Sequence, residues 1–182
     1  MRATGFVSGV AATTIVLLQG LVNASAAQAE DYGIALNGTY RAVSNGDWAQ
    51  SSQGPYGAGG ARVYRDEATK VETWTVSSDC VSPIECAGEV TSDAGWTAPL
   101  KWNGNGWFVD RDIPNWEPCP DGTAAPGHQT FGLWDFDPSL SRRDPKARDL
   151  IVGFEKTQAP SGACGVNKPL VIQLPVRLDK LS

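Results

Sequence analysis

Short runs in which apolar and polar residues alternate follow one another along most of this chain. The clearest run is residues 71–77, where Trp74 and Val76 fall on the same face. Alternation with a period of two is typical of a β-strand with one buried face. Glycine, proline, asparagine and aspartate separate the runs, as they do between the strands of an antiparallel sheet.

About eight short strands are predicted, joined mostly as simple hairpins. The strands are expected at residues 39–43, 71–77, 86–91, 96–102, 107–112, 128–136, 149–156 and 170–178. Residues 46–60 and 113–127 are expected to be long loops, the second because it carries four prolines. Asn-Gly occurs twice in residues 103–106, between two aromatic-rich runs, and predicts a tight hairpin turn. Pro175 indicates that the last strand is an edge strand or contains a bulge.

The predicted fold class is all-β, because helical periodicity is almost absent. Strands without helices to cover them must bury their faces against one another, and a small closed β-barrel or a β-sandwich achieves this. We favour the barrel, formed by an antiparallel meander, and keep the sandwich as the alternative. The length of 182 residues fits one domain with a substantial core.

The first 29 residues have the features of a secretory signal peptide. Arg2 gives a positive start, Val10 to Val22 is apolar, and small residues follow at positions 24–29. The apolar run is short for a membrane span. We therefore expect a signal peptide at 1–29, a single secreted domain at 30–182, and no membrane span once the signal is removed.

All four cysteines lie after the expected signal peptide: Cys80, Cys86, Cys119 and Cys164. An even number in an exported chain predicts two disulfides. Three pairings are open, and we favour Cys80–Cys86 with Cys119–Cys164 because the first two flank a turn. No CxxC motif is present, so a metal site is not expected.

The charge of the chain argues against nucleic acid as a partner. The formal net charge is −5, and loss of Arg2 with the signal makes it one unit more negative. An acidic protein of this size repels polyanions. Residues 141–149 form a basic segment, expected to be a solvated hairpin tip, with contact to an anionic polymer or lipid headgroup as the alternative.

Candidates for catalysis are few. His128 is the only histidine, and it is expected to be a turn or strand-start residue rather than a general base. A hydrolase would need His128, or a pair among Asp110, Asp112 and Glu117, to line one cleft. Asp135 also shares a strand face with a neighbouring acid, but the rest of an EF-hand calcium loop is missing. We therefore expect no enzyme activity, no cofactor and no catalytic residue.

Seven tryptophans are the most unusual feature of the composition. Aromatic faces on a rigid sheet can stack on sugar rings or line an apolar cavity, but they also fill cores. Trp74, Trp107 and Trp134 are expected in the core. The candidate ligand contacts are Trp96, Trp102 and Trp116.

Five segments carry a resemblance to a known group of proteins. They are residues 37–40 (NGTY), 72–76 (ETWTV), 86–96 (CAGEVTSDAGW), 114–119 (PNWEPC) and 162–167 (GACGVN). In these segments the chain resembles a family of small exported proteins of mycobacteria and related actinobacteria, over essentially the whole expected mature domain. The resemblance implies a secreted or envelope-associated protein and supplies no functional residue.

Three functions are compatible with these observations. The first is a non-catalytic secreted or cell-envelope binding protein, whose partner is an apolar or carbohydrate ligand or another envelope or host protein. An open apolar cavity or an exposed aromatic groove would favour it. The second is a structural or host-facing envelope protein without a small ligand, favoured if the barrel is filled by its own tryptophans. The third is an extracellular hydrolase.

Overall fold

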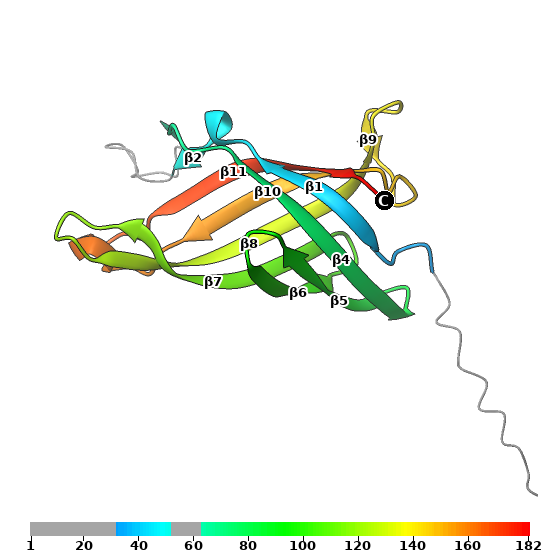
Figure 1. Ribbon diagram of the computed structural model, residues 1–182, viewed down its shortest axis with the longest axis horizontal. Coiled ribbons are helices and arrows are strands. Elements are labelled where there is room, and N and C mark those ends of the chain that lie inside the picture. The colour runs from blue at the N-terminus through cyan, green and yellow to red at the C-terminus, as the bar shows by residue number, and fades with distance from the viewer. Residues whose placement is uncertain (1–31, 52–62) are drawn as a thin grey trace, which may run out of the picture.

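The computed structural model describes residues 32–51 and 63–182 (Figure 1). Eight long strands make up most of the described chain. They are β1 (Gly38–Ser44), β4 (Lys70–Ser82), β5 (Glu85–Ser92), β6 (Trp96–Trp102), β7 (Trp107–Pro118), β8 (Ala124–Asp137), β10 (Leu150–Gln158) and β11 (Val171–Lys180). The short elements are η1 (Gly46–Trp48), β2 (Gln50–Ser51), β3 (Val63–Tyr64), β9 (Arg142–Arg143) and η2 (Ala163–Gly165).

The eight long strands form a closed antiparallel barrel. Their order is β1-β4-β5-β6-β7-β8-β10-β11, and β11 pairs back onto β1 from Tyr40↔Lys180 to Ser44↔Val176. Figure 1 shows these two strands side by side, the first in blue and the last in red. The all-β class and the barrel are therefore confirmed, and the alternative of a sandwich is wrong because the first and last strands join.

The lumen of the barrel is filled by the inward-facing side chains of its own strands. Trp74 and Trp107 are each only 1% exposed, which confirms two of the three tryptophans predicted in the core. The ring of Phe131 lies 4.9 Å from that of Trp74 and 6.1 Å from that of Trp96. Trp134 differs from the prediction because it faces outward on β8 and is only half-buried.

The turn between β6 and β7 was correctly predicted from its Asn-Gly pairs. Gly104 has a φ of 88°, which the absence of a Cβ permits. The side-chain oxygen of Asn103 accepts hydrogen bonds from the backbone N–H groups of Asn105 and Gly106, both at 3.0 Å. The side chain thus stabilises the turn that its sequence indicates.

The prediction of a loop at residues 113–127 is wrong. β7 continues to Pro118 and β8 begins at Ala124, so the two strands form a hairpin that extends past the neighbouring strands. The register shifts between Ile113 and Glu117, which is a bulge that accommodates proline within paired strands. Two small clusters of buried residues lie beside this extension, and Trp116 packs against both: Ala49, Ile172 and Leu174 form one, and Cys119, Ala125 and Ala159 form the other.

Pro175 lies within β11 at a gap between two of its partners. On one side β11 pairs with β10 throughout, with Pro175 opposite Phe154. On the other side it pairs with β2 at residues 172–173 and with β1 from Val176 onward. Of the two expectations for this strand, the edge strand is wrong, because β11 is paired on both sides; Pro175, which has no N–H group, lies at the interruption between its pairings with β2 and β1.

Both predicted disulfides are present. Cys80 pairs with Cys86 across the β4–β5 hairpin, with a Cα–Cα distance of 4.0 Å. Cys119 pairs with Cys164 at 5.1 Å and ties the β7–β8 tip to the turn before β11. Disulfides of this kind are typical of chains that fold in an oxidising compartment.

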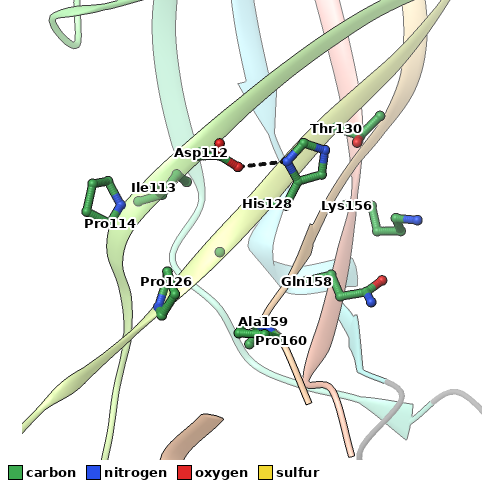
Figure 2. Close-up of a pocket in the computed structure, with 11 residues that line it drawn as sticks. Asp112, Ile113, Pro114, Pro126, His128, Thr130, Lys156, Gln158, Ala159 and Pro160 are labelled. Carbon is green, nitrogen blue, oxygen red and sulfur yellow. Dashed lines mark hydrogen bonds and ion pairs between the residues drawn. The ribbon is translucent and has the colours of Figure 1, made fainter. Parts of the chain in front are cut away.

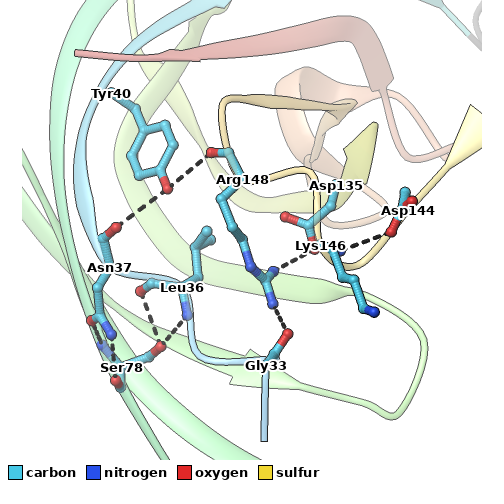
Figure 3. Close-up of polar contacts among 9 residues, drawn as sticks. All are labelled: Gly33, Leu36, Asn37, Tyr40, Ser78, Asp135, Asp144, Lys146 and Arg148. Atoms are coloured by element: carbon cyan, nitrogen blue, oxygen red, sulfur yellow. Dashed lines mark hydrogen bonds and ion pairs between the residues drawn. The ribbon is translucent and has the colours of Figure 1, made fainter. Parts of the chain in front are cut away.

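One end of the barrel is closed by the segment that leads into β1 (Figure 3). Leu36 is fully buried, and its N–H donates to the hydroxyl of Ser78 at 2.7 Å. The Arg148 guanidinium donates to a carboxylate oxygen of Asp135 at 2.6 Å and to the carbonyl of Gly33. The expectation of a solvated tip at 141–149 is therefore wrong for Arg148, because this side chain fastens the closing segment to β8.

Within the described residues, no helix is long and apolar enough to cross a membrane.

The two disulfides should contribute unequally to stability. Chain-entropy arithmetic gives about 4 kcal/mol for the bridge across 45 residues and about 2 kcal/mol for the bridge across 6 residues. We expect the double variant Cys119→Ala/Cys164→Ala to lose more free energy of unfolding in urea than Cys80→Ala/Cys86→Ala. A larger loss for the short bridge would contradict the view that loop closure dominates.

Asp135 should impose a pH dependence on stability. Burial raises the pKa of its carboxyl to about 6, against a pull downward from Arg148. Between pH 4 and pH 6 Asp135 in the folded chain thus retains a proton that the unfolded chain has released. The free energy of unfolding therefore falls as the pH rises through this range.

The Asp135→Asn variant removes this titration. The free energy of unfolding of the variant minus that of wild type should therefore increase by about 2–3 kcal/mol from pH 4 to pH 7, measured by urea unfolding. A difference between the two proteins that stays constant with pH would contradict the account of Asp135.

Candidate functional site

A groove of about 390 Å³ runs over the outer face of β7, β8 and β10 (Figure 2). We call it the His128 groove. β7 and the residues near its bulge supply Asp112, Ile113 and Pro114. β8 supplies Pro126, Gly127, His128 and Thr130. The third side is the C-terminal end of β10, with Lys156 and Gln158, together with the two residues that follow the strand, Ala159 and Pro160.

The antiparallel register explains why polar residues gather along one side of this groove. His128 lies opposite Asp112 on β7 and opposite Gln158 on β10. Two residues further along β8, Thr130 lies between its partners Asp110 and Lys156 on the same two strands. Residues two apart on a strand share a face, so two polar rows form side by side on the outside of the barrel.

The acids fix the orientation of the His128 imidazole. Its Nδ1 lies 2.8 Å from an Asp112 carboxylate oxygen, and its Nε2 lies 3.7 Å from Asp110. The Thr130 hydroxyl donates to the same Asp110 oxygen at 2.7 Å. Because the side chains of His128 and Asp112 are 57% and 85% exposed, their contact adds little to folding stability and its atoms are open to a ligand.

The rest of the groove is apolar and conformationally stiff. Ile113, Pro114, Pro126, Ala159 and Pro160 line it. The proline ring fixes φ and contributes little side-chain entropy, so ordering such a surface on binding costs little. An apolar surface with a few convergent polar groups is the usual composition of a ligand site.

Behind the groove, the inner face of the same strands holds a charged network. Glu155 on β10 and Gln129 on β8 are each 1% exposed. The Lys70 ammonium lies 2.8 Å from a Glu155 carboxylate oxygen, and the Gln129 amide donates to that oxygen at 2.6 Å. Arg111 on β7 donates to the Gln129 carbonyl and stacks over the Trp96 ring at 4.2 Å. Burial lowers the pKa of Arg111, while the carboxylates of Glu72 and Glu155 raise it.

This network holds together the three strands that carry the groove. Charges buried in a protein persist only where they are paired and hydrogen-bonded, so the partners must keep their positions. A displacement of β10 relative to β8 would break the contact between Glu155 and Gln129. The outer face is therefore presented on a rigid wall.

The tryptophans proposed as ligand contacts lie outside the His128 groove. Trp96 faces the lumen, and its Nε1 donates to Glu72 at 3.1 Å. Trp102 lines a separate hollow of about 280 Å³ near Trp134 and Arg143 at the closed end. Trp116 packs against the small cluster of Cys119, Ala125 and Ala159, beside the Cys119–Cys164 bridge. Trp102 is therefore a predicted contact that does border a cavity.

The acidic candidates separate into two groups. Asp110 and Asp112 meet at His128, as a hydrolase would require. Glu117 instead pairs with Arg65 at 2.9 Å, and Asp135 pairs with Arg148. Among the described residues, no group of three or more His, Cys, Asp or Glu side chains could hold a metal ion.

Sequence reasoning missed the residues from β10 and the apolar lining. Lys156 ends the strand predicted at 149–156 and Gln158 lies beyond it, and the position of both residues beside β8 depends on the β8–β10 register. A hairpin turn of fixed length specifies register, and no such turn joins these strands.

Comparison with models of known protein families and with curated proteins finds no match to this chain.

Proposed function

We propose that this chain is a non-catalytic, exported binding protein that recognises its ligand on the outer face of β7, β8 and β10. The observation that carries the proposal is the His128 groove, in which exposed polar groups of fixed orientation border a stiff apolar surface. The two disulfides are consistent with export. The resemblance to small exported actinobacterial proteins supports a location outside the cell or in its envelope.

The filled lumen favours recognition on the surface over enclosure of a ligand. Trp74, Trp107 and Phe131 occupy the interior, which a carrier of the enclosing type would leave open. The same filling suits the alternative of a structural or host-facing envelope protein. We prefer the binding role because a purely structural wall has no need of an open groove with convergent polar groups.

An extracellular hydrolase is the second candidate, favoured by the contact between Asp112 and His128. An imidazole oriented by a carboxylate can act as a general base on water. Against a covalent mechanism, Thr130 is the one hydroxyl side chain that lines the groove among the described residues, and it donates to Asp110. The four cysteines are all in disulfides.

Retention of envelope material by the immobilised protein tests the binding role. The double variant His128→Ala/Gln158→Ala removes two facing polar groups from the groove and leaves its apolar lining. We expect it to retain the bound component at least about tenfold less than wild type, as when central contacts of an interface are removed. The matched control is Thr91→Ala/Thr97→Ala, an exposed cross-strand pair on the β5–β6 wall.

Three outcomes of this experiment discriminate between the candidates. Loss in the groove variant alone supports the proposed site. Equal retention by wild type and both variants, or retention of nothing, contradicts it. If the wild type degrades the retained component and His128→Ala does not, the hydrolase is correct and the non-catalytic role is wrong.

A further inference from the structure

A pair of aromatic side chains lies exposed on the outside of the barrel, beyond β11. Trp48 at the end of η1 is 59% exposed and Tyr64 on β3 is 69% exposed. Their ring centroids lie 6.3 Å apart at an interplanar angle of 71°. Trp74 and Trp107 are each only 1% exposed, so the exposure of Trp48 is unusual within the molecule as well as for its residue type.

Trp48 is held on a rigid turn. The Gly46 N–H donates to the Thr69 hydroxyl at 2.9 Å, and the Ala49 N–H donates to the Gly46 carbonyl at 3.0 Å. Gly46 packs so closely on the segment between β3 and β4 that a Cβ would lie 1.9 Å from the carbonyl oxygen of Glu67. Little conformational entropy is therefore lost when a ligand contacts the ring of Trp48.

A groove of about 490 Å³ lies beside Trp48, over β10, β11 and β2, and we call it the Trp48 groove. Trp48, Phe154 and Pro175 supply apolar surface. Gln50 and Gln173 face each other across the β2–β11 pairing and supply two side-chain amides. Neither amide has a hydrogen-bond partner among the described residues. Figure 1 shows η1 and β2 beside one another at this end of the barrel.

The chemistry of the Trp48 groove selects a neutral ligand rich in hydroxyl groups. No charged side chain lines the groove in the described part of the chain, so an anionic or cationic ligand would lose hydration without gaining an ion pair. Each glutamine amide can both donate and accept, which matches a hydroxyl group. The flat indole of Trp48 offers a surface for C–H groups. A sugar ring presents hydroxyls at its edge and C–H groups on its faces.

We propose that the Trp48 groove binds a neutral carbohydrate, with a sugar ring on Trp48 and its hydroxyls bonded to Gln50 and Gln173. The inference rests on the proposed binding role and adds to it a second site with its own ligand class, which depends on neither His128 nor Gln158. The site lies on the same wall of the barrel, since Gln173 is the cross-strand neighbour of Lys156. A chain of several sugars would follow this row toward Thr130, so oligosaccharides should bind more tightly than single sugars.

Two-dimensional ¹⁵N NMR titration of the disulfide-bonded protein tests the proposal. The probes are neutral oligosaccharides of different linkage (maltohexaose, cellohexaose, laminarihexaose and mannohexaose), with polygalacturonate as the anionic comparison. We expect at least one neutral oligosaccharide to shift the indole N–H of Trp48 and the side-chain amides of Gln50 and Gln173. Polygalacturonate should leave these signals unchanged.

Variants separate this site from the rest of the wall. Trp48→Ala and Gln50→Ala/Gln173→Ala should each weaken binding about tenfold or more, as loss of a central aromatic or paired polar contact does. Ile84→Ala, a 78% exposed residue of the β4–β5 turn, is the matched control and should bind like wild type. In His128→Ala, the signals of Trp48, Gln50 and Gln173 should still shift on addition of the same oligosaccharide, because His128 does not line the Trp48 groove.

Three results would overturn the proposal. The first is that no neutral oligosaccharide shifts the Trp48 signals. The second is that polygalacturonate shifts them more than any neutral probe. The third is that the shifts map to the His128 groove and are lost in His128→Ala, which would leave the proposed binding role in place while removing the Trp48 site.

Discussion

The pairing of β1 with β11 is the constraint on which the rest of the structure depends. It joins the two ends of the sheet from Tyr40↔Lys180 to Ser44↔Val176 and leaves the barrel without a long free edge. Closure also fixes the volume of the lumen, so the inward positions must fill it at the density of a protein interior. Trp74 and Trp107 do so together with the other inward residues. The large aromatic side chains that give the chain its unusual composition thus lie mostly in the core, and we therefore assign recognition to the outer face.

The wall made of β7, β8, β10 and β11 has a different role from the opposite wall. It extends beyond the neighbouring strands, is tied at its tip by the Cys119–Cys164 bridge, and holds Glu155 and Gln129 in contact on its inner face. A buried carboxylate bonded to neighbours on adjacent strands resists sliding of those strands. The outer face of this wall carries both grooves, and a fixed backbone beneath them keeps their side chains in place. The stiffness of the wall and the openness of its outer face together make it the part of the molecule suited to binding.

Local patterns predicted the parts of the fold that depend on neighbours in the sequence. The alternation at Trp74 and Val76 and the Asn-Gly turn at 103–106 specify a strand and a hairpin directly. Both disulfides followed from an even number of cysteines and a preference for the nearest pair.

The prolines of residues 113–127 led to the wrong prediction of a loop, because proline disfavours a regular strand. In the structure, the bulge near Ile113 accommodates proline within the paired strands. Arg148 and Glu155 could not be placed, since their partners Asp135 and Gln129 are brought to them by pairing between distant segments. For the same reason, the sequence did not indicate that Trp48 and Gln173 line one groove.

Native mass spectrometry of the protein, purified without denaturation, tests most directly the claim that the closed barrel is filled by its own side chains. The account predicts a bare chain whose mass is lower than that of the reduced protein by the four hydrogens lost in two disulfides. It also predicts that unfolding releases no apolar compound. An additional apolar mass that is retained in the folded state and lost on unfolding would show that the lumen accommodates a ligand. That result would contradict the assignment of recognition to the outer face.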